Sequence, residues 1–350
     1  MIALPNVGPG HAVLAFDVGG TDIKSALIDE HGEVRGVGRS ATPVERSEQP
    51  EDLAQQSAAS TMRLGAAPQI IDRLYELQRE LMLAHPDVTP VAASIVVPGI
   101  VDPERGVGVF ASNLGWREAP IRDLAEERLG LPVAFNHDIH SASSAELQLG
   151  GAREFCNAVV VIIGTGIAAT IIIDGEPYLA GGFAGEIGHA PVADGPLCRC
   201  GGHGCLEALA SGGAIARRYR ERVRASGDTR RTPDRVHEIL ALVEAGDVDA
   251  GAVWDDALNA LTASFAQITG LIAPDAIVIG GGLSLAGETL LAPLRERLDA
   301  RLTFHRRPQI LAAQLGENAG LIGAVLFARA RAEQVHGAPL GMSQPTADPR

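Results

Sequence analysis

The chain has 350 residues, more than a single small core requires, so we expect two domains. Its formal net charge of −14 at pH 7 excludes a surface that follows nucleic-acid phosphates without regard to base sequence. The apolar runs are of strand length and no basic, apolar leader begins the chain, so neither a membrane span nor a signal peptide is expected.

Residues 11–41 predict three strands joined by two short turns. Because Gly19 and Gly20 are followed by another strand and not by a helix, the segment is neither a dinucleotide-binding fold nor a P-loop. The glycine turn, with Thr21, can still offer backbone N–H groups to phosphate oxygens. Asp17 ends a buried strand, where it can orient a metal ion or its waters. The alternative is an ordinary turn with a hydrogen-bonded aspartate.

A long stretch separates this hairpin from the next glycine turn. It predicts a loop with some helix at 43–68, a helix at 69–84, a buried strand at 91–102 that breaks at Pro98-Gly99, and a helix at 120–129. The loop after the strand ends in Ser-Asn-Leu-Gly-Trp, where Asn113 either hydrogen-bonds a ligand hydroxyl or forms a turn.

A strand at 131–135 leads into Asn136, His137 and Asp138, and a helix begins soon after. The start of a helix favours an ionised carboxylate, so Asp138 can accept a proton from an alcohol. The alternative is an aspartate that only caps the helix. His137 and His140 can simply be polar surface residues.

The pattern of strand, glycine turn and strand recurs at 158–180, with Gly164, Thr165 and Gly166 at the turn. This repeat predicts two related α/β halves. Two such hairpins that face each other across a cleft would hold a polyphosphate from both sides.

His189, Cys198, Cys200 and Cys205 lie within seventeen residues. Three thiolates and an imidazole predict a closed, tetrahedral zinc site of the structural kind. The alternatives are a disulfide or buried free thiols, although a bridge between Cys198 and Cys200 would be strained by their one-residue separation. Cysteines grouped in this way suit a reducing cytoplasm.

Two carboxylates flank these cysteines and are not needed as ligands: Glu186 and Glu207. A bound metal would hold both of them, and the free nitrogen of His189, rigidly toward a ligand.

The C-terminal part predicts helices at 208–226 and 255–272. A strand at 276–284 then runs into Gly280, Gly281 and Gly282, where the backbone can approach a flat ligand such as a nucleotide base. The chain closes with a helix at 315–333 and a frayed tail.

Together these motifs resemble the ROK family of sugar kinases (repressor, open reading frame, kinase) over about residues 12–330. The sequence DVGGTDIK is similar to the first phosphate motif of that family, GTG to the second, and GGG to its adenosine loop. The segments GEIGH and CRCGGHGCLE are similar to its zinc signature. The resemblance implies an α/β, actin/hexokinase-like (ribonuclease H-like) fold with two lobes and a central ATP/sugar cleft.

The implied lobes are 1–135 plus 317–335, and 136–316 with the zinc knuckle, followed by a flexible tail at 336–350. The resemblance makes Asp138 the catalytic base. The implied sugar contacts are Asn113, His137, Asp138, Glu186, His189 and Glu207. The implied contacts of ATP and Mg²⁺ are Asp17, Gly19, Gly20, Thr21, Lys24, Gly164, Thr165, Gly166, Gly280, Gly281 and Gly282. The implied ligands of a structural Zn²⁺ are His189, Cys198, Cys200 and Cys205.

The sequence departs from the family pattern at two places. His137 stands where the family usually has asparagine, which affects sugar identity more than kinase activity. The sequence IGTGIAAT also lacks the extra glycines that often follow the second phosphate turn, but its GTG core remains.

The implied activity is ATP-dependent phosphorylation of a hexose, with glucose to glucose 6-phosphate as the leading reaction. Mannose, fructose, allose and N-acylated amino sugars such as N-acetylmannosamine stay open as acceptors, as does polyphosphate as donor. A catalytically silent sugar-binding protein is a further alternative. Sixteen residues precede Asp17 and the charge is strongly negative, so a DNA-binding repressor is not expected. We expect a cytoplasmic dimer or tetramer.

Overall fold

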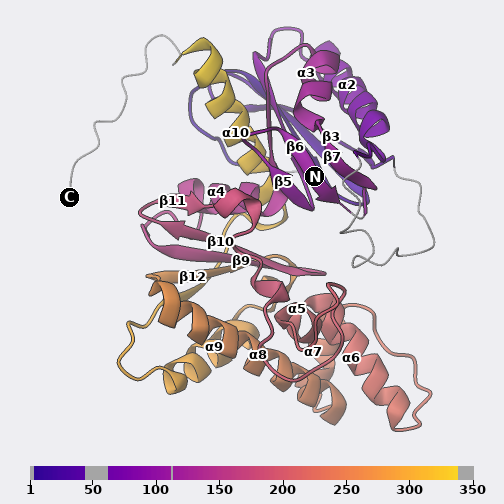
Figure 1. Ribbon diagram of the computed structural model, residues 1–350, viewed down its shortest axis with the longest axis vertical. Coiled ribbons are helices and arrows are strands. Elements are labelled where there is room, and N and C mark those ends of the chain that lie inside the picture. The colour runs from indigo at the N-terminus through magenta and orange to yellow at the C-terminus, as the bar shows by residue number, and fades with distance from the viewer. Residues whose placement is uncertain (1–3, 44–61, 112, 338–350) are drawn as a thin grey trace. The chain divides into compact units, whose positions relative to one another are not determined.

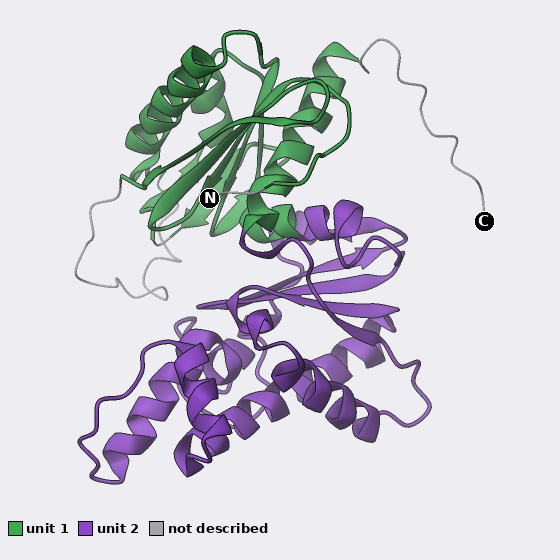
Figure 2. Ribbon diagram, turned by 180° about the vertical axis from the view of Figure 1, so that it is seen from behind, with its two compact units in different colours: residues 1–47, 61–142, 318–350 green, residues 48–60, 143–317 purple. Residues whose placement is uncertain are grey.

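The computed structural model describes residues 4–43, 62–111 and 113–337. The predicted loop at 44–61 and most of the predicted tail, at 338–350, lie outside the described residues. Two compact units form, the first from the described parts of 1–47, 61–142 and 318–350 and the second from 143–317 (Figure 2). Within the described residues, no helix has both the length and the apolar character that a membrane span requires.

The first unit is built on a five-stranded sheet with the strand order β3-β2-β1-β4-β8. Its strands are β1 (Val13–Val18), β2 (Asp22–Ile28), β3 (Val34–Ala41), β4 (Ala92–Val97) and β8 (Val133–His137). β2 runs antiparallel to both its neighbours, whereas β1, β4 and β8 are parallel. The carboxyl ends of these three strands therefore meet at one edge, which is where polar groups of α/β proteins commonly bind ligands.

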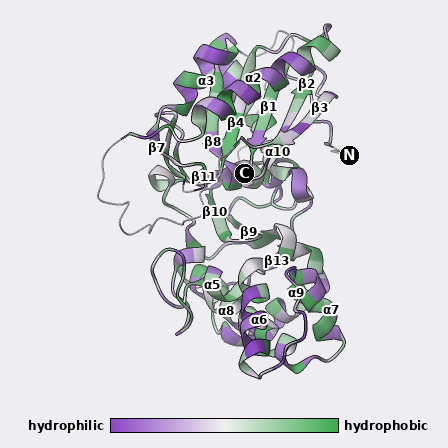
Figure 3. Ribbon diagram, turned by 90° about the vertical axis from the view of Figure 1, so that its right-hand side faces the viewer, coloured by the Kyte–Doolittle hydropathy of each residue, from purple (hydrophilic) through white to green (hydrophobic). Residues whose placement is uncertain are grey.

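Helices cover both faces of this sheet (Figure 1). Leu14 and Phe16 point to the face packed by α2 (Ala67–Ala84) and α3 (Ile121–Leu129). Val13 and Ala15 point to the opposite face, which α10 (Ala319–His336) covers with Leu321, Val325 and neighbouring residues. Because successive strand residues alternate between faces, a central strand covered on both sides is apolar throughout. Figure 3 shows this contrast between the apolar strands and the mixed surfaces of α2 and α3.

A small antiparallel sheet is inserted into the first unit between β4 and α3. It consists of β5 (Ile100–Asp102), β6 (Val107–Ala111) and β7 (Trp116–Ala119). The break predicted at Pro98-Gly99 is confirmed, because it separates β4 from β5, and these two strands belong to different sheets.

The second unit repeats the first sheet, with the order β11-β10-β9-β12-β13. Its strands are β9 (Ala158–Ile163), β10 (Ile167–Ile173), β11 (Glu176–Tyr178), β12 (Ala276–Gly280) and β13 (Gln309–Ala312). β10 is antiparallel to β9 and β11, and β12 is parallel to β9 and β13. The repeat predicted from the two glycine hairpins is confirmed, and with it the duplicated α/β fold.

One face of the second sheet packs against helices that follow the cysteine-rich segment. They are α5 (Leu206–Ala210), α6 (Gly212–Ala225), α7 (Val236–Glu244), α8 (Val248–Ile272) and α9 (Glu288–Arg301). The prediction of one helix at 208–226 is wrong, because the chain is extended at Ser211. The hydroxyl of Ser211 accepts a hydrogen bond from the N–H of Ala214 at 3.1 Å and starts α6 as its N-cap.

A buried carboxylate fastens the segment that leaves the second unit. Glu146 lies in α4 (Asp138–Leu149), and its side chain has no exposed surface. It accepts hydrogen bonds from the backbone N–H groups of Gly151, Gln314 and Leu315 at 2.8 to 3.0 Å. These bonds tie α4 to the end of β13, just ahead of α10.

Candidate active site

Asp17 lies near the carboxyl end of β1, on the sheet face that α10 covers. It is directly opposite Lys24 in the β1–β2 pair, so both side chains project from the same face. A β-carbon on Gly320, in the first turn of α10, would lie 3.0 Å from Oδ2 of Asp17. Burial raises the pKa of Asp17 to about 6; Lys24 lowers it, and Asp138 raises it further. A buried carboxylate in these surroundings is suited to a cation or its waters.

Asp138 is the first residue of α4, directly after β8 ends at His137. Its Oδ1 accepts a hydrogen bond from the N–H of Ile139 at 2.7 Å. Burial raises the pKa of Asp138 to about 7, and hydrogen bonds from backbone N–H groups only partly oppose this effect. The carboxylate therefore has the basicity that a general base needs near neutral pH.

The alternative that His137 and His140 are simply polar surface residues does not hold. The side chain of His137 is 16% exposed and the whole of His140 is 7% exposed, and their rings meet edge to face with centroids 5.3 Å apart. Burial lowers the pKa of each to about 4, with His137 adding to the effect on His140. Both rings are therefore neutral near pH 7.

The first glycine turn is held by a threonine that the sequence did not single out. Thr42 donates its backbone N–H to the carbonyl oxygen of Thr21 at 2.9 Å and its hydroxyl to that of Gly19 at 2.7 Å. These bonds occupy carbonyl oxygens that would otherwise repel phosphate. Asn113, which is exposed, lies against the same turn, since a β-carbon on Gly20 would be 3.0 Å from its Nδ2.

In the second unit, the GEIGH segment packs along the first half of β10. The N–H of Ala169 donates to the carbonyl oxygen of Gly185 at 2.9 Å, and Gly185 has φ +86°. A β-carbon on Gly188 would lie 2.0 Å from the carbonyl oxygen of Ile167, so the two backbones touch. This packing holds Glu186 beside the strand. Partial desolvation raises the pKa of Glu186; His189 opposes this effect and Glu207 adds to it.

Glu207 lies in the first turn of α5 and reaches the second glycine turn. Its Oε2 accepts a hydrogen bond from the N–H of Ile167 at 2.9 Å. A β-carbon on Gly166 would lie 2.6 Å from the same oxygen. Sequence reasoning missed this contact, because it joins residues that are far apart in the chain.

The two other predicted nucleotide-binding glycine segments adjoin each other. Gly281, with φ +79°, lies so close to Ile163 that a β-carbon would be 2.5 Å from its carbonyl oxygen. Gly164 follows Ile163 directly, and its carbonyl oxygen accepts a hydrogen bond from the N–H of Gly212 at 2.9 Å. The N-terminus of α6 therefore also lies at this turn. The Ser-Gly-Gly sequence before α6 was the signal that could have indicated it.

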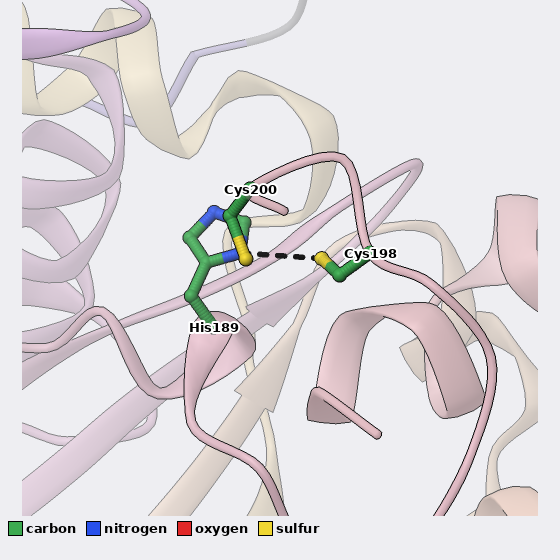
Figure 4. A group of neighbouring side chains, drawn as sticks. All are labelled: His189, Cys198 and Cys200. Atoms are coloured by element: carbon green, nitrogen blue, oxygen red, sulfur yellow. Dashed lines mark hydrogen bonds between the residues drawn. The ribbon is translucent and has the colours of Figure 1, made fainter. Parts of the chain in front are cut away.

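Three of the four predicted zinc ligands form a compact group, and the fourth, Cys205, lies beside Cys200. Ligand atoms of His189, Cys198 and Cys200 are all within 4.8 Å of one another (Figure 4). Sγ of Cys198 is 3.6 Å from Nδ1 of His189, and Sγ of Cys205 is 3.7 Å from that of Cys200. All four cysteines of the chain are free thiols. Gly204, with φ +67°, allows the tight turn that returns the chain to Cys205.

The predicted site residues thus form one group in each unit. The first group contains Asp17, Gly19, Gly20, Thr21, Lys24, Asn113, His137 and Asp138. The second contains Gly164, Thr165, Gly166, Glu186, His189, Cys198, Cys200, Cys205, Glu207, Gly280, Gly281 and Gly282.

Residues 13–331 match the model of the ROK family. A glucokinase of Streptomyces coelicolor is 32% identical over 338 residues, 90% of this chain and 97% of that protein. An N-acetylmannosamine kinase of Escherichia fergusonii is 30% identical, and the match covers 90% of this chain and 98% of that protein. A ROK family glucokinase from Streptomyces griseus has been solved in complex with glucose and AMPPNP. Its structure matches this chain with a TM-score of 0.71 at 30% identity, over 91% of this chain and 99% of that one. The chain therefore belongs to the ROK family, as a sugar kinase of the phosphotransferase class.

Proposed function

We propose that this kinase transfers the γ-phosphoryl group of ATP to a hydroxyl of a hexose, with glucose as the preferred acceptor. The observation that carries the proposal is Asp138, a carboxylate at a helix start with a pKa raised to about 7. Such a group is ionised often enough to accept a proton and basic enough to hold it. The similarity to glucokinases, one of them solved with glucose and AMPPNP, supports the choice of acceptor and donor.

Phosphoryl transfer requires positioning and charge stabilisation more than covalent chemistry by the protein. In our proposal, Asp138 removes the proton from the sugar hydroxyl as that oxygen attacks. The exposed Asn113 and the neutral His137 hydrogen-bond other hydroxyls of the sugar. Glu186 and His189 are proposed sugar contacts as well, and such hydrogen bonds orient an acceptor for attack.

The glycine segments of the second unit fit a nucleotide. A β-carbon on Gly164 or on Gly282 would meet no atom within 4 Å, so the space beside both residues is open. The start of α6 adds a helix N-terminus, which attracts phosphate. In the first unit, Asp17 and Lys24 fit a magnesium ion and a phosphate group. When bound, Mg·ATP supplies the phosphoryl group with its charge partly neutralised.

The cysteine cluster fits a structural zinc ion. Three sulfurs and one imidazole nitrogen are the donor set of closed zinc sites. Burial and the neighbouring thiols raise the pKa of Cys205 to about 12, so a cation is what would turn this group of thiols into thiolates. The ion would fix the segments that carry Glu186, His189 and Glu207.

His137 is the residue through which we expect the acceptor to be selected. A neutral imidazole offers one donor and one acceptor, as an amide does, but from a larger ring with fixed geometry. N-acetylmannosamine is therefore the first alternative to glucose, because a relative of similar identity bears that name.

The test is a panel of sugars incubated with ATP and Mg²⁺, read as ADP release. It should include glucose, mannose, fructose, allose and N-acetylmannosamine, with a polyphosphate arm in place of ATP. We expect the highest kcat/KM with glucose and ATP, and none with any sugar in the Asp138→Asn variant. Sugar binding without ADP release in the unmodified protein would instead show a silent sugar-binding protein. Sedimentation velocity tests the proposed dimer or tetramer.

A further inference from the structure

The contact between Glu207 and Ile167 links two parts of the second unit that are assigned separate tasks. Glu207 follows the zinc ligand Cys205 by two residues, whereas Ile167 is the first residue after the phosphate turn at 164–166. Oε2 of Glu207 accepts the hydrogen bond of the Ile167 N–H at 2.9 Å. One of its two carboxylate oxygens is therefore engaged by the protein's own backbone.

Ile167 is held on its other side by the same zinc segment. Its carbonyl oxygen lies against Gly188, the residue before the zinc ligand His189, where a β-carbon would be only 2.0 Å away. The backbone unit at the start of β10 is thus contacted on both sides by residues that flank two of the proposed zinc ligands. A shift of either Glu207 or Gly188 is therefore expected to move Ile167.

The turn also lies against the start of α6, where a β-carbon on Gly213 would be 3.2 Å from the carbonyl oxygen of Thr165. Gly164 donates its N–H to the carbonyl oxygen of Gly166 at 2.9 Å, which closes the turn, and accepts from Gly212 at its start. Gly166 has no side chain, and the nearest atom that a β-carbon there would meet is Oε2 of Glu207, at 2.6 Å. The carboxylate of Glu207 therefore fixes the far end of the turn.

We propose that Glu207 is a positioning residue for the nucleotide as well as a sugar contact: it holds the phosphate turn at 164–166 in the shape that receives phosphate. Nucleotide affinity then depends on the zinc segment even when no sugar is present. This inference rests on the proposed function, in which the turn at 164–166 binds ATP. It predicts that substitutions of Glu207 can weaken nucleotide binding and glucose binding separately.

The test compares Glu207→Gln with Glu207→Ala in the full-length protein. Glutamine keeps a carbonyl oxygen that can accept from Ile167 but loses the charge, whereas alanine leaves the Ile167 N–H without its acceptor. By titration calorimetry without sugar, we expect Glu207→Ala to bind Mg·AMPPNP about tenfold more weakly. Glu207→Gln should bind the nucleotide as the unmodified protein does, yet bind glucose more weakly. Glu186→Ala is the control, and we expect it to weaken the binding of glucose but not that of Mg·AMPPNP.

Hydrogen exchange supplies a readout that needs no ligand. Peptides that cover 164–168 should exchange faster in Glu207→Ala than in the unmodified protein or Glu207→Gln. Equal exchange and equal nucleotide affinity in Glu207→Ala would overturn the inference. If the unmodified protein itself bound no Mg·AMPPNP, the proposed function would fail, and this outcome is distinct from equal affinities among variants.

A double-mutant cycle with Gly166→Ala isolates the contact. The added methyl group would lie 2.6 Å from Oε2 of Glu207, so it should displace the carboxylate. The single substitution should therefore weaken nucleotide binding. In the Glu207→Ala background the same methyl group meets no carboxylate, so its effect should largely vanish. Additive losses would show that the two residues act independently and would contradict the proposal.

Discussion

Nε2 of His137 lies 3.4 Å from Oδ1 of Asp138, yet the two side chains do not form an ion pair near neutral pH. Burial lowers the pKa of His137 to about 4, so the ring is neutral. It therefore contributes no positive charge that would stabilise the carboxylate of Asp138. Burial is what raises the pKa of Asp138, and no charge on His137 offsets it. The neutral ring is left to hydrogen-bond a hydroxyl.

Replacing Asp138 with asparagine should remove the base and keep the shape of the site. The amide oxygen can still accept from Ile139, so the start of α4 should persist. We expect kcat to fall by at least about a hundredfold, with sugar affinity still measurable by calorimetry. Full activity in this variant would exclude Asp138 from the mechanism.

Activity should decline as the pH falls through about 7. Only ionised Asp138 accepts a proton, and burial raises its pKa from 3.8 to about 7, so the loss begins well above the range of an ordinary aspartate. The measurement is kcat/KM for the sugar between pH 5 and 9, a range chosen to span about two units on each side. His137→Asn is the matched control and should retain the acid limb, because His137 is already neutral there. If the loss of activity at low pH disappeared in this control, the group that titrates would be His137 and not Asp138.

Loss of zinc should loosen the cysteine cluster and the residues that it holds. We expect chelation, or Cys200→Ser, to lower the Tm by about 5 °C or more and to raise the KM for sugar. Cys156→Ser is the control, since Cys156 is exposed and outside the cluster. Metal analysis of the purified protein should find about one zinc ion per chain. An unchanged Tm and KM after complete metal removal would argue against a structural ion.

Glu146→Ala should destabilise the protein strongly. It leaves the N–H groups of Gly151, Gln314 and Leu315 without the acceptor that the fully buried carboxylate supplies. We expect the free energy of unfolding to fall by about 3 kcal/mol or more, since each buried donor without a partner costs about 1–3 kcal/mol. Glu146→Gln should be intermediate. As a control, Glu154→Ala, at an exposed position, should change the free energy of unfolding by less than about 0.5 kcal/mol. A similarly small change in Glu146→Ala would refute this account.

The sequence predicted those parts of the fold that local pattern determines. Strand, glycine turn and strand follow directly from alternating apolar residues and paired glycines, so both hairpins and their repetition were predicted correctly. The cluster of His189 with the cysteines was also predictable, because its ligands lie within one short segment.

Contacts between distant segments were not predictable. Nothing near His140 in the sequence indicates that its side chain is buried. Nothing near Gly320 indicates that it lies close to Asp17. The Glu207 contact is of the same kind: its partner Ile167 lies forty residues earlier. The break between α5 and α6 was missed for another reason, since the Ser-Gly-Gly signal was local but was read as part of one helix.

The cover that α10 provides for β1 has a consequence for protein synthesis. Leu321 and Val325 close the sheet face formed by Val13 and Ala15, yet they leave the ribosome some three hundred residues later. Every strand of the second unit, by contrast, has emerged before α10 does. Until α10 emerges, the nascent chain therefore keeps this apolar face of the first sheet uncovered, and chaperones can bind it there.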